Sequence, residues 1–181
     1  MIIGVFGSAD ALPEQIQKIA YQLGESLAKR NITALTGACG GVSAAVVAGC
    51  KNNNGLTIGV SPARNKDEHI NKNNLPTQDL DIIIYTGSGY KGRNIVAVQS
   101  SDICIFVRGG VGTLNELTIA IDEGKIIGLL QETGGTADMA SNFIRDFTNQ
   151  NLIRGSNFRV YANSKVDSLL EEITKAFTGG T

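Results

Sequence analysis

The sequence predicts an α/β protein built on one doubly wound, mainly parallel sheet of about seven strands, with helices on both faces. Short apolar runs rich in β-branched residues alternate along the chain with longer segments that have a helical period. Most of these runs are too continuous for strands that face water on one side, which favours a buried parallel sheet. Because neither a repeat nor a low-complexity linker interrupts the alternation, residues 1–181 are expected to form one domain.

Seven apolar runs are predicted to be strands. In chain order they are residues 2–6, 32–35, 56–60, 81–85, 103–107, 126–130 and 158–161. A first helix is predicted to begin at Pro13, because proline is tolerated in the first helical turn. Further helices are predicted for residues 42–50, 91–100, 113–124, 137–149 and 166–177.

Two segments carry more specific expectations. In the helix over residues 113–124, the apolar side chains of Leu114, Leu117 and Ile121 are predicted to face inward. The polar segment 64–78 is the one long loop, and its histidine, His69, is predicted to be exposed to solvent.

The composition excludes several classes of protein. Apolar residues make up 42% of the chain, which is enough for a core and argues against a disordered protein. The 16 basic and 17 acidic residues give a net charge of −1, without the basic field that drives non-specific nucleic-acid binding. Since no apolar run approaches the roughly 20 residues that span a bilayer, no membrane segment or signal peptide is expected. We therefore expect a cytoplasmic protein.

The cysteines and the known nucleotide motifs add further exclusions. Cys39, Cys50 and Cys104 form no CxxC pair, so neither a disulfide framework nor a metal site is expected. Cys39 has no histidine nearby in sequence to activate it as a nucleophile. The chain contains neither the glycine spacing of a standard NAD site nor a P-loop.

Glycine accounts for 22 of the 181 residues, well above the usual share of about 7%. The glycines gather in clusters that follow predicted strands. In an open parallel sheet, ligands bind beyond the carboxyl ends of the strands. The glycine clusters therefore predict a ligand site at that edge of the sheet.

The sharpest cluster is Gly109-Gly110-Val111-Gly112-Thr113, which follows a predicted strand and leads into a helix. Its glycines expose backbone N–H groups, and the helix dipole adds partial positive charge, so a phosphate is the expected occupant. Thr113 and Glu116 also match the capping box S/T-x-x-E, which any helix can carry. Both interpretations of Glu116, as a cap and as a functional carboxylate, remain open.

Two further clusters have the same position relative to the strands. The sequence Thr36-Gly37-Ala38-Cys39-Gly40-Gly41 follows the second predicted strand, where a tight turn alone would need fewer glycines. The third cluster places Arg93 near the start of a helix, against the positive end of its dipole. That position suggests an anionic partner, although a solvated surface arginine is the alternative.

These motifs resemble the Lonely Guy (LOG) family, long mislabelled as lysine decarboxylases. Gly109-Gly110-Val111-Gly112-Thr113-Leu114-Asn115-Glu116 is similar to the family signature P-G-G-x-G-T-x-x-E, and Gly92-Arg93-Asn94 lies where the family carries its catalytic arginine. The resemblance implies a Rossmann-like fold and hydrolysis of nucleoside 5′-monophosphates to the base and ribose 5-phosphate. It implies no decarboxylase activity, and it requires no cofactor.

The resemblance assigns roles to individual residues. Glu116 and Arg93 are the expected catalytic residues. The expected ligand-binding and phosphate-binding residues are Gly7, Ser8, Thr36, Gly37, Gly40, Gly41, Gly109, Gly110, Gly112 and Thr113. A small phosphorylated ligand is the expected partner.

Two departures from the LOG pattern favour an alternative function. Arg108 replaces the proline, and Asn94 stands where LOG enzymes usually have lysine. The second departure resembles a sister branch that includes molybdenum-cofactor carrier proteins, which bind a phosphorylated pterin. The alternative is therefore a non-catalytic carrier of the molybdenum cofactor or a sensor of a nucleotide ligand. A bound nucleotide, phosphate or molybdenum cofactor is compatible with the hydrolase and with the carrier or sensor.

A homodimer is also predicted, with tetramers as a further option that the family resemblance allows. The helix over residues 42–50 contains Val46, Val47 and Ala48 in succession, and residues 95–98 are similarly apolar. Because one sheet cannot cover two faces of a helix, part of this surface is expected to meet a second subunit.

Overall fold

The computed structural model describes residues 1–153 and 157–179. Across these residues the chain forms a seven-stranded sheet in which every strand pair is parallel, with the order β4-β3-β2-β1-β5-β6-β7. The strands are β1 (Ile2–Gly7), β2 (Thr33–Thr36), β3 (Thr57–Ser61), β4 (Ile82–Tyr85), β5 (Ile103–Val107), β6 (Ile126–Leu130) and β7 (Arg159–Asn163). The predicted fold class is confirmed.

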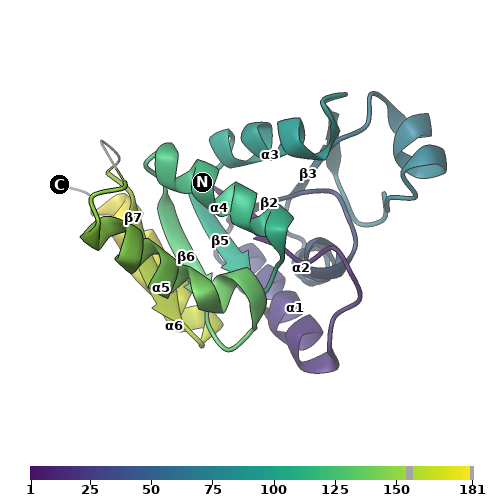
Figure 1. The fold of residues 1–181 in the computed structure, drawn as a ribbon. Coiled ribbons are helices and arrows are strands. Elements are labelled where there is room, and N and C mark those ends of the chain that lie inside the picture. The colour runs from purple at the N-terminus through teal and green to yellow at the C-terminus, as the bar shows by residue number, and fades with distance from the viewer. Residues whose placement is uncertain (154–156, 180–181) are drawn as a thin grey trace.

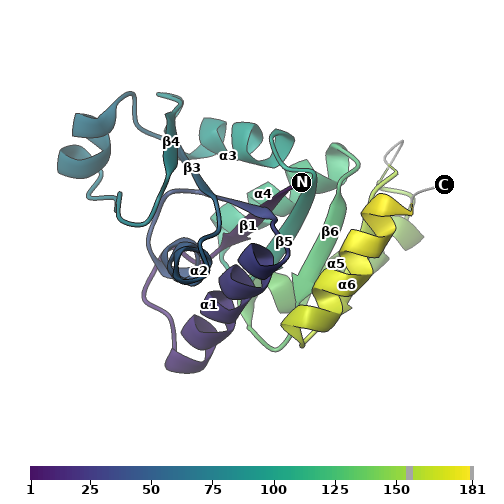
Figure 2. The same cartoon turned by 180° about the vertical axis from the view of Figure 1, so that it is seen from behind.

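Helices cover both faces of the sheet, as Figures 1 and 2 show from opposite sides. One face carries α1 (Glu14–Lys29), α2 (Gly41–Asn52) and α6 (Val166–Thr178). The other face carries α3 (Gly89–Gln99), α4 (Val111–Asp122) and α5 (Gly135–Asn149). Two apolar cores result, one on each side of the sheet. No helix in the described part of the chain has the length and apolar content to cross a bilayer.

The order of the strands places a crevice at the centre of the sheet. From β1 the chain moves outward through β2 and β3 to the edge strand β4, and then returns through α3 to β5. Because β5 pairs with the other side of β1, the direction of winding reverses between these two strands. Such a reversal separates the loops above the carboxyl ends of the strands and leaves room for a ligand.

The packing of α2 corrects the reasoning behind the dimer prediction. Val46 and Val47 are both buried within the monomer, because α1 covers the side of α2 that the sheet does not reach. The two helices approach closely at glycines: a Cβ atom at Gly24 would meet the Val46 carbonyl oxygen, and one at Gly49 would meet that of Tyr21. The apolar character of α2 therefore reflects intramolecular packing.

The prediction of a solvated His69 is wrong. The segment 64–78 contains a short helical turn, η1 (Glu68–Lys72), and the His69 side chain is fully buried. Its Nε2 lies 3.0 Å from the Pro76 carbonyl oxygen, and its Nδ1 lies 2.8 Å from Ser61 Oγ. Because a carbonyl can only accept, Nε2 carries the proton, and the Ser61 hydroxyl donates to Nδ1. His69 thus connects the end of β3 to the far part of the segment.

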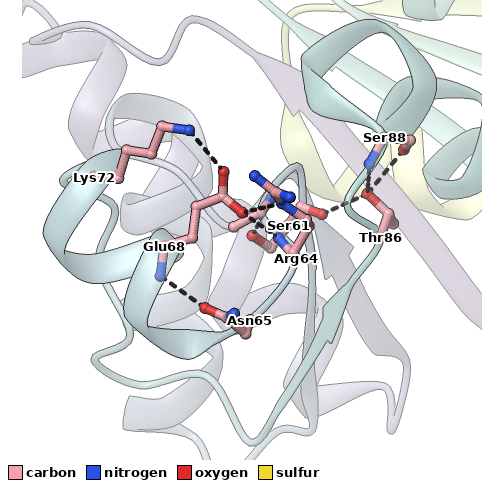
Figure 3. Close-up of polar contacts among 8 residues, drawn as sticks. Ser61, Arg64, Asn65, Glu68, Lys72, Thr86 and Ser88 are labelled. Atoms are coloured by element: carbon pink, nitrogen blue, oxygen red, sulfur yellow. Dashed lines mark hydrogen bonds and ion pairs between the residues drawn. The ribbon is translucent and has the colours of Figure 1, made fainter.

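The outer side of the same segment is held by Glu68, as shown in Figure 3. Its Oε2 accepts a 2.9 Å hydrogen bond from the Arg64 backbone N–H, and its Oε1 lies 3.1 Å from Lys72 Nζ. The hydrogen bond from Arg64 and the contact with Lys72 lower the pKa of the Glu68 carboxyl from 4.5 to about 2. Figure 3 also shows the Thr86 hydroxyl donating to the Ser61 carbonyl oxygen, which joins the ends of β3 and β4. The long segment is therefore an ordered structure.

Replacing His69 with leucine should lower the free energy of unfolding by about 1–3 kcal/mol, because the partly buried Pro76 carbonyl loses its donor. Urea unfolding measures this change, and hydrogen exchange should show faster exchange confined to residues 64–78. Asn71→Ala is the matched control: Asn71 is an exposed neighbour in the same turn, and its loss should change stability by less than about 0.5 kcal/mol. Equal stability of the His69 and Asn71 variants would contradict the role assigned to His69.

Candidate functional site

A cavity of about 310 Å³ lies above the carboxyl ends of β1, β2 and β5, where the winding of the sheet reverses. Segments from four parts of the chain form its walls: the loop after β1, the turn after β2, and the first two turns of α3 and of α4. The structure brings together eight of the twelve residues predicted from the sequence. These are Gly7, Ser8, Gly37, Arg93, Gly110, Gly112, Thr113 and Glu116.

The other four predicted residues do not line the cavity. Thr36 lines a neighbouring cavity of about 220 Å³. Gly41 and Gly109 have φ angles of 56° and 96°, a left-handed conformation that glycine adopts without strain. At Gly40, a Cβ atom would lie 2.8 Å from the Ala9 carbonyl oxygen. These three glycines shape the turns that surround the cavity.

The β5–α4 loop differs from the predicted capping box. Gly110 is the N-cap and α4 begins at Val111, so Thr113 lies inside the first turn and Glu116 inside the second. No side chain caps this helix, which excludes the capping interpretation of Glu116. The earlier start also changes the buried face. Leu114 is 37% exposed, so the prediction that it faces inward is wrong, whereas Leu117 and Ile121 are buried as predicted.

The start of α4 leaves open space beside its backbone. A Cβ atom added at Gly110 or at Gly112 would meet nothing within 4 Å, so these glycines are not required by packing inside the protein. The N–H groups in the first turn of a helix have no intrahelical partners, and the helix dipole makes this end positive. A phosphate can therefore approach the backbone at these two positions and accept hydrogen bonds from it.

Residues from the β6–α5 loop and from the first turn of α5 hold this glycine loop in place. The Thr136 hydroxyl donates to the Gly110 carbonyl oxygen at 2.9 Å. The Thr133 hydroxyl accepts a 2.8 Å hydrogen bond from the Arg108 backbone N–H, and the Arg108 guanidinium donates to the Thr133 carbonyl oxygen. Arg108 has a φ of 54°, so these bonds support a strained backbone directly before the loop. Sequence reasoning did not identify either threonine.

Arg93 and Glu116 meet inside the cavity. Arg93 Nη1 lies 3.4 Å from Glu116 Oε1, and the two side chains are only 8% and 7% exposed. The Arg93 guanidinium also lies against the backbone of Gly37, where any Cβ atom would collide with it. This contact explains one glycine of the second cluster: residue 37 must leave room for the arginine.

The charges of this pair are incompletely satisfied. Arg93 Nε is buried and has no hydrogen-bond partner within residues 1–153 and 157–179. Burial raises the pKa of the Glu116 carboxyl from 4.5 to about 7, although the positive charge of Arg93 opposes the rise. A buried donor without an acceptor and a carboxyl that titrates near neutrality are typical of a functional site.

The sequence analysis missed several residues that line the cavity, including Asp10, Ser43, Tyr90 and Asn94. Asn94 follows Arg93 directly, so its position in the third glycine cluster was the available signal. Ser43 lies at the start of α2, directly after the second glycine cluster, which was the signal for it. Asp10 had no such signal, because only the tertiary structure brings the loop after β1 to the cavity. Burial raises the pKa of the Cys39 thiol, which keeps it in the protonated, weakly nucleophilic form.

Gly112→Ala should fold with unchanged or slightly higher stability, because alanine is the better helix former and its methyl group enters open space. It should weaken the binding of inorganic phosphate at least about tenfold, a loss of about 1.4 kcal/mol, by blocking access to the backbone. Isothermal titration calorimetry and thermal unfolding measure the two effects. Thr118→Ala, on the exposed side of the same helix, should leave phosphate binding unchanged. Normal phosphate affinity in Gly112→Ala would exclude this loop as the phosphate site.

Comparison with known proteins agrees with these motifs. Residues 1–161 match the model of the SLOG cluster4 family. An uncharacterised protein of Archaeoglobus fulgidus is 38% identical over 131 residues, which cover 72% of this chain and 80% of that protein.

Two solved structures are similar over nearly the whole chain. The molybdenum cofactor binding protein from the phototrophic bacterium Rippkaea orientalis is 32% identical, with a TM-score of 0.77 and coverage of 96% of this chain and 95% of that one. The molybdenum cofactor carrier protein of Chlamydomonas reinhardtii is 27% identical, with a TM-score of 0.72 and coverage of 98% of both chains. With the family match spanning most of its length, the chain belongs to the SLOG cluster4 family.

Proposed function

We propose that this protein binds a phosphorylated heterocyclic ligand in the cavity between the glycine loop and Arg93. One observation carries the proposal: the accessible backbone at Gly110 and Gly112 faces the same cavity as a buried guanidinium with an unpartnered nitrogen. Phosphate oxygens are good acceptors for both kinds of donor. The heterocyclic part of the ligand would occupy the rest of the cavity, beside the exposed ring of Tyr90.

The molybdenum cofactor, a phosphorylated pterin, is the first candidate ligand. The similarity to proteins described as binding or carrying this cofactor supports it. The residues of the cavity fit such a ligand, because Arg93 and the start of α4 can hold a phosphate. In this function no bond would be broken: the cavity would hold the pterin and release it to an acceptor.

Hydrolysis of a nucleoside 5′-monophosphate is the second candidate, and the position of Glu116 favours it. Cleavage of the N-glycosidic bond builds positive charge on the ribose, which an ionised carboxylate can stabilise. Glu116 can also accept a proton from the attacking water, while binding of the phosphate positions the ribose. Water would lose one proton to Glu116 and bond to the anomeric carbon, while the electron pair of the broken N-glycosidic bond stays on the base nitrogen. That nitrogen would take up one proton from solvent, so that ribose 5-phosphate and the neutral base leave.

Incubation with AMP and a panel of other nucleoside monophosphates separates the two functions. Chromatography would detect the products, and the release of free base and ribose 5-phosphate would support the hydrolase. Tight binding of the molybdenum cofactor without base release from any nucleotide would support the carrier. If the protein binds neither nucleotides, nor the cofactor, nor inorganic phosphate, the proposed function is wrong.

Two variants then test the residues. Arg93→Ala should weaken the binding of phosphorylated ligands by about 1.5–3 kcal/mol, because the phosphate loses a charged donor. If the protein is a hydrolase, Glu116→Gln should keep ligand binding but lower turnover by about two orders of magnitude or more. A carrier would show only the effect of Arg93. Full turnover in Glu116→Gln would exclude this carboxyl as the catalytic group.

A homodimer remains part of the proposal, but its surface is relocated to the α3, α4 and α5 side. Exposed apolar residues there include Ile95, Val111, Leu114 and Met139, with Val111 85% and Met139 71% exposed. Val111 also lines the cavity, so a partner on this surface would border the ligand site.

Light scattering at micromolar concentration should give the mass of a dimer or of a larger assembly. Met139→Glu should shift the protein toward the monomer, because a charge cannot be buried at an apolar interface without cost. Gln17→Glu, an exposed position on α1, is the control and should not change the mass. A monomeric wild-type protein would contradict the dimer.

A further inference from the structure

Asn94 is a buried side chain whose contacts converge on Glu116. It lies on α3 directly after Arg93 and is only 5% exposed. When its amide nitrogen faces the cavity, it donates to the Tyr90 carbonyl oxygen at 2.9 Å and to Glu116 Oε1 at 3.1 Å. The carboxyl of Glu116 thus has two neighbouring donors from α3, one charged and one neutral.

The amide of Asn94 can serve both protonation states of that carboxyl. An ionised Glu116 accepts a hydrogen bond from the Asn94 nitrogen. In the opposite orientation, Asn94 Nδ2 donates to Asn115 Oδ1 at 2.9 Å, and the Asn94 oxygen lies against two acceptors, the Tyr90 carbonyl oxygen and Glu116 Oε1. A protonated Glu116 can donate to that oxygen, because an amide accepts as well as donates. A lysine at this position could stabilise only the ionised carboxyl.

The charged groups around Glu116 make its protonation relevant to ligand binding. Arg93 is the one cationic side chain among the described residues that line the cavity. Cys39 from the turn after β2 and Cys104 from β5 are buried thiols whose pKa values are raised by burial, so they stay neutral. Asp10, at the rim, adds a second carboxyl. An anionic ligand would therefore compete with Glu116 for a single guanidinium.

We propose that Asn94 is a positioning residue that allows the Glu116 carboxyl to take up a proton when a phosphorylated ligand binds. The carboxylate oxygen gains one proton from solvent, and no other bond forms or breaks. Neutralising Glu116 frees the charge of Arg93 for the phosphate and removes a repulsive anion from the cavity. This inference rests on the proposed ligand-binding function and adds a pH dependence to it.

Sulfate is the probe for this inference, because it stays a dianion over the whole range from about pH 6 to 8.5, so that only the protein titrates. In the wild-type protein, sulfate affinity should fall about tenfold per pH unit above the midpoint of Glu116. Calorimetry in two buffers with different ionisation enthalpies should show uptake of up to one proton per bound sulfate. Sulfate binding that neither changes with pH nor takes up a proton would overturn the proposal.

The role of Asn94 is tested in the ligand-free protein, so that it does not depend on any ligand. NMR of ¹³C-glutamate-labelled protein, with Glu116→Gln to assign the resonance, gives the midpoint of the Glu116 titration directly. Asn94→Lys should lower this midpoint by about one pH unit or more and abolish proton uptake with sulfate. Asn94→Asp, in which the side chain keeps its shape, should raise the midpoint of the Glu116 titration by a similar amount, because two carboxyls would then share a proton.

Two controls introduce the same charges elsewhere. Asn149 lies at the exposed end of α5. Asn149→Lys and Asn149→Asp should move the midpoint of the Glu116 titration by less than about 0.3 pH unit, because salt screens distant surface charges. Equal midpoints in wild type and both Asn94 variants would exclude the positioning role while leaving the proposed ligand binding intact. If sulfate, nucleotides and the molybdenum cofactor all fail to bind the wild-type protein, the proposed function fails, and with it the proton uptake. The NMR midpoints would then still decide whether Asn94 controls Glu116.

Discussion

The buried guanidinium of Arg93 is the constraint around which the cavity is arranged. It reaches from α3 across the turn after β2 to Glu116 on α4, and therefore connects three segments that are distant in sequence. Burying a cation is costly unless it is paired and hydrogen-bonded, and here the pairing is incomplete, because Arg93 Nε has no acceptor among the described residues. An anionic ligand would supply this acceptor, so the incomplete pairing of Arg93 favours the binding of an anion.

The remaining parts of the site follow from the topology of the sheet. The reversal between β1 and β5 separates the loops that follow these strands, and the start of α4 lies beside the opening. Glycines appear there for two different reasons. Gly37 makes room for a side chain of the protein itself, whereas Gly110 and Gly112 leave space that nothing in the described chain fills. The second kind of glycine is the better indicator of a ligand, because internal packing does not require it.

Carrier and hydrolase make different demands on one cavity. Both need a phosphate site, which the glycine loop and Arg93 can provide. Only the hydrolase needs an ionised carboxylate close to the reacting ribose, and the burial that raises the pKa of Glu116 to about 7 makes that form incomplete at neutral pH. A protonated Glu116 instead favours retention of an anion. If the proposed functions hold, the balance between the two forms of Glu116 would separate holding a ligand from cleaving it, and Asn94 is a neighbour that contacts this carboxyl.

The sequence by itself determined the local features of this protein. Apolar runs located all seven strands, with β5 and β6 correct at both ends. The expected burial holds for β5 and β6, whereas the edge strands β4 and β7 are only partly buried, because each has a neighbouring strand on one side only. Glycine clusters after the strands marked the loops of the cavity, and the signature around Gly110 and Glu116 indicated the family. Only the tertiary structure decided which surfaces and charges meet. It buried His69, covered α2 with α1, moved the start of α4 to Val111, and brought Asn94 and Arg93 against Glu116. Periodicity and turn chemistry act between residues that are close in the chain, whereas burial and ionisation depend on neighbours that only the folded packing supplies.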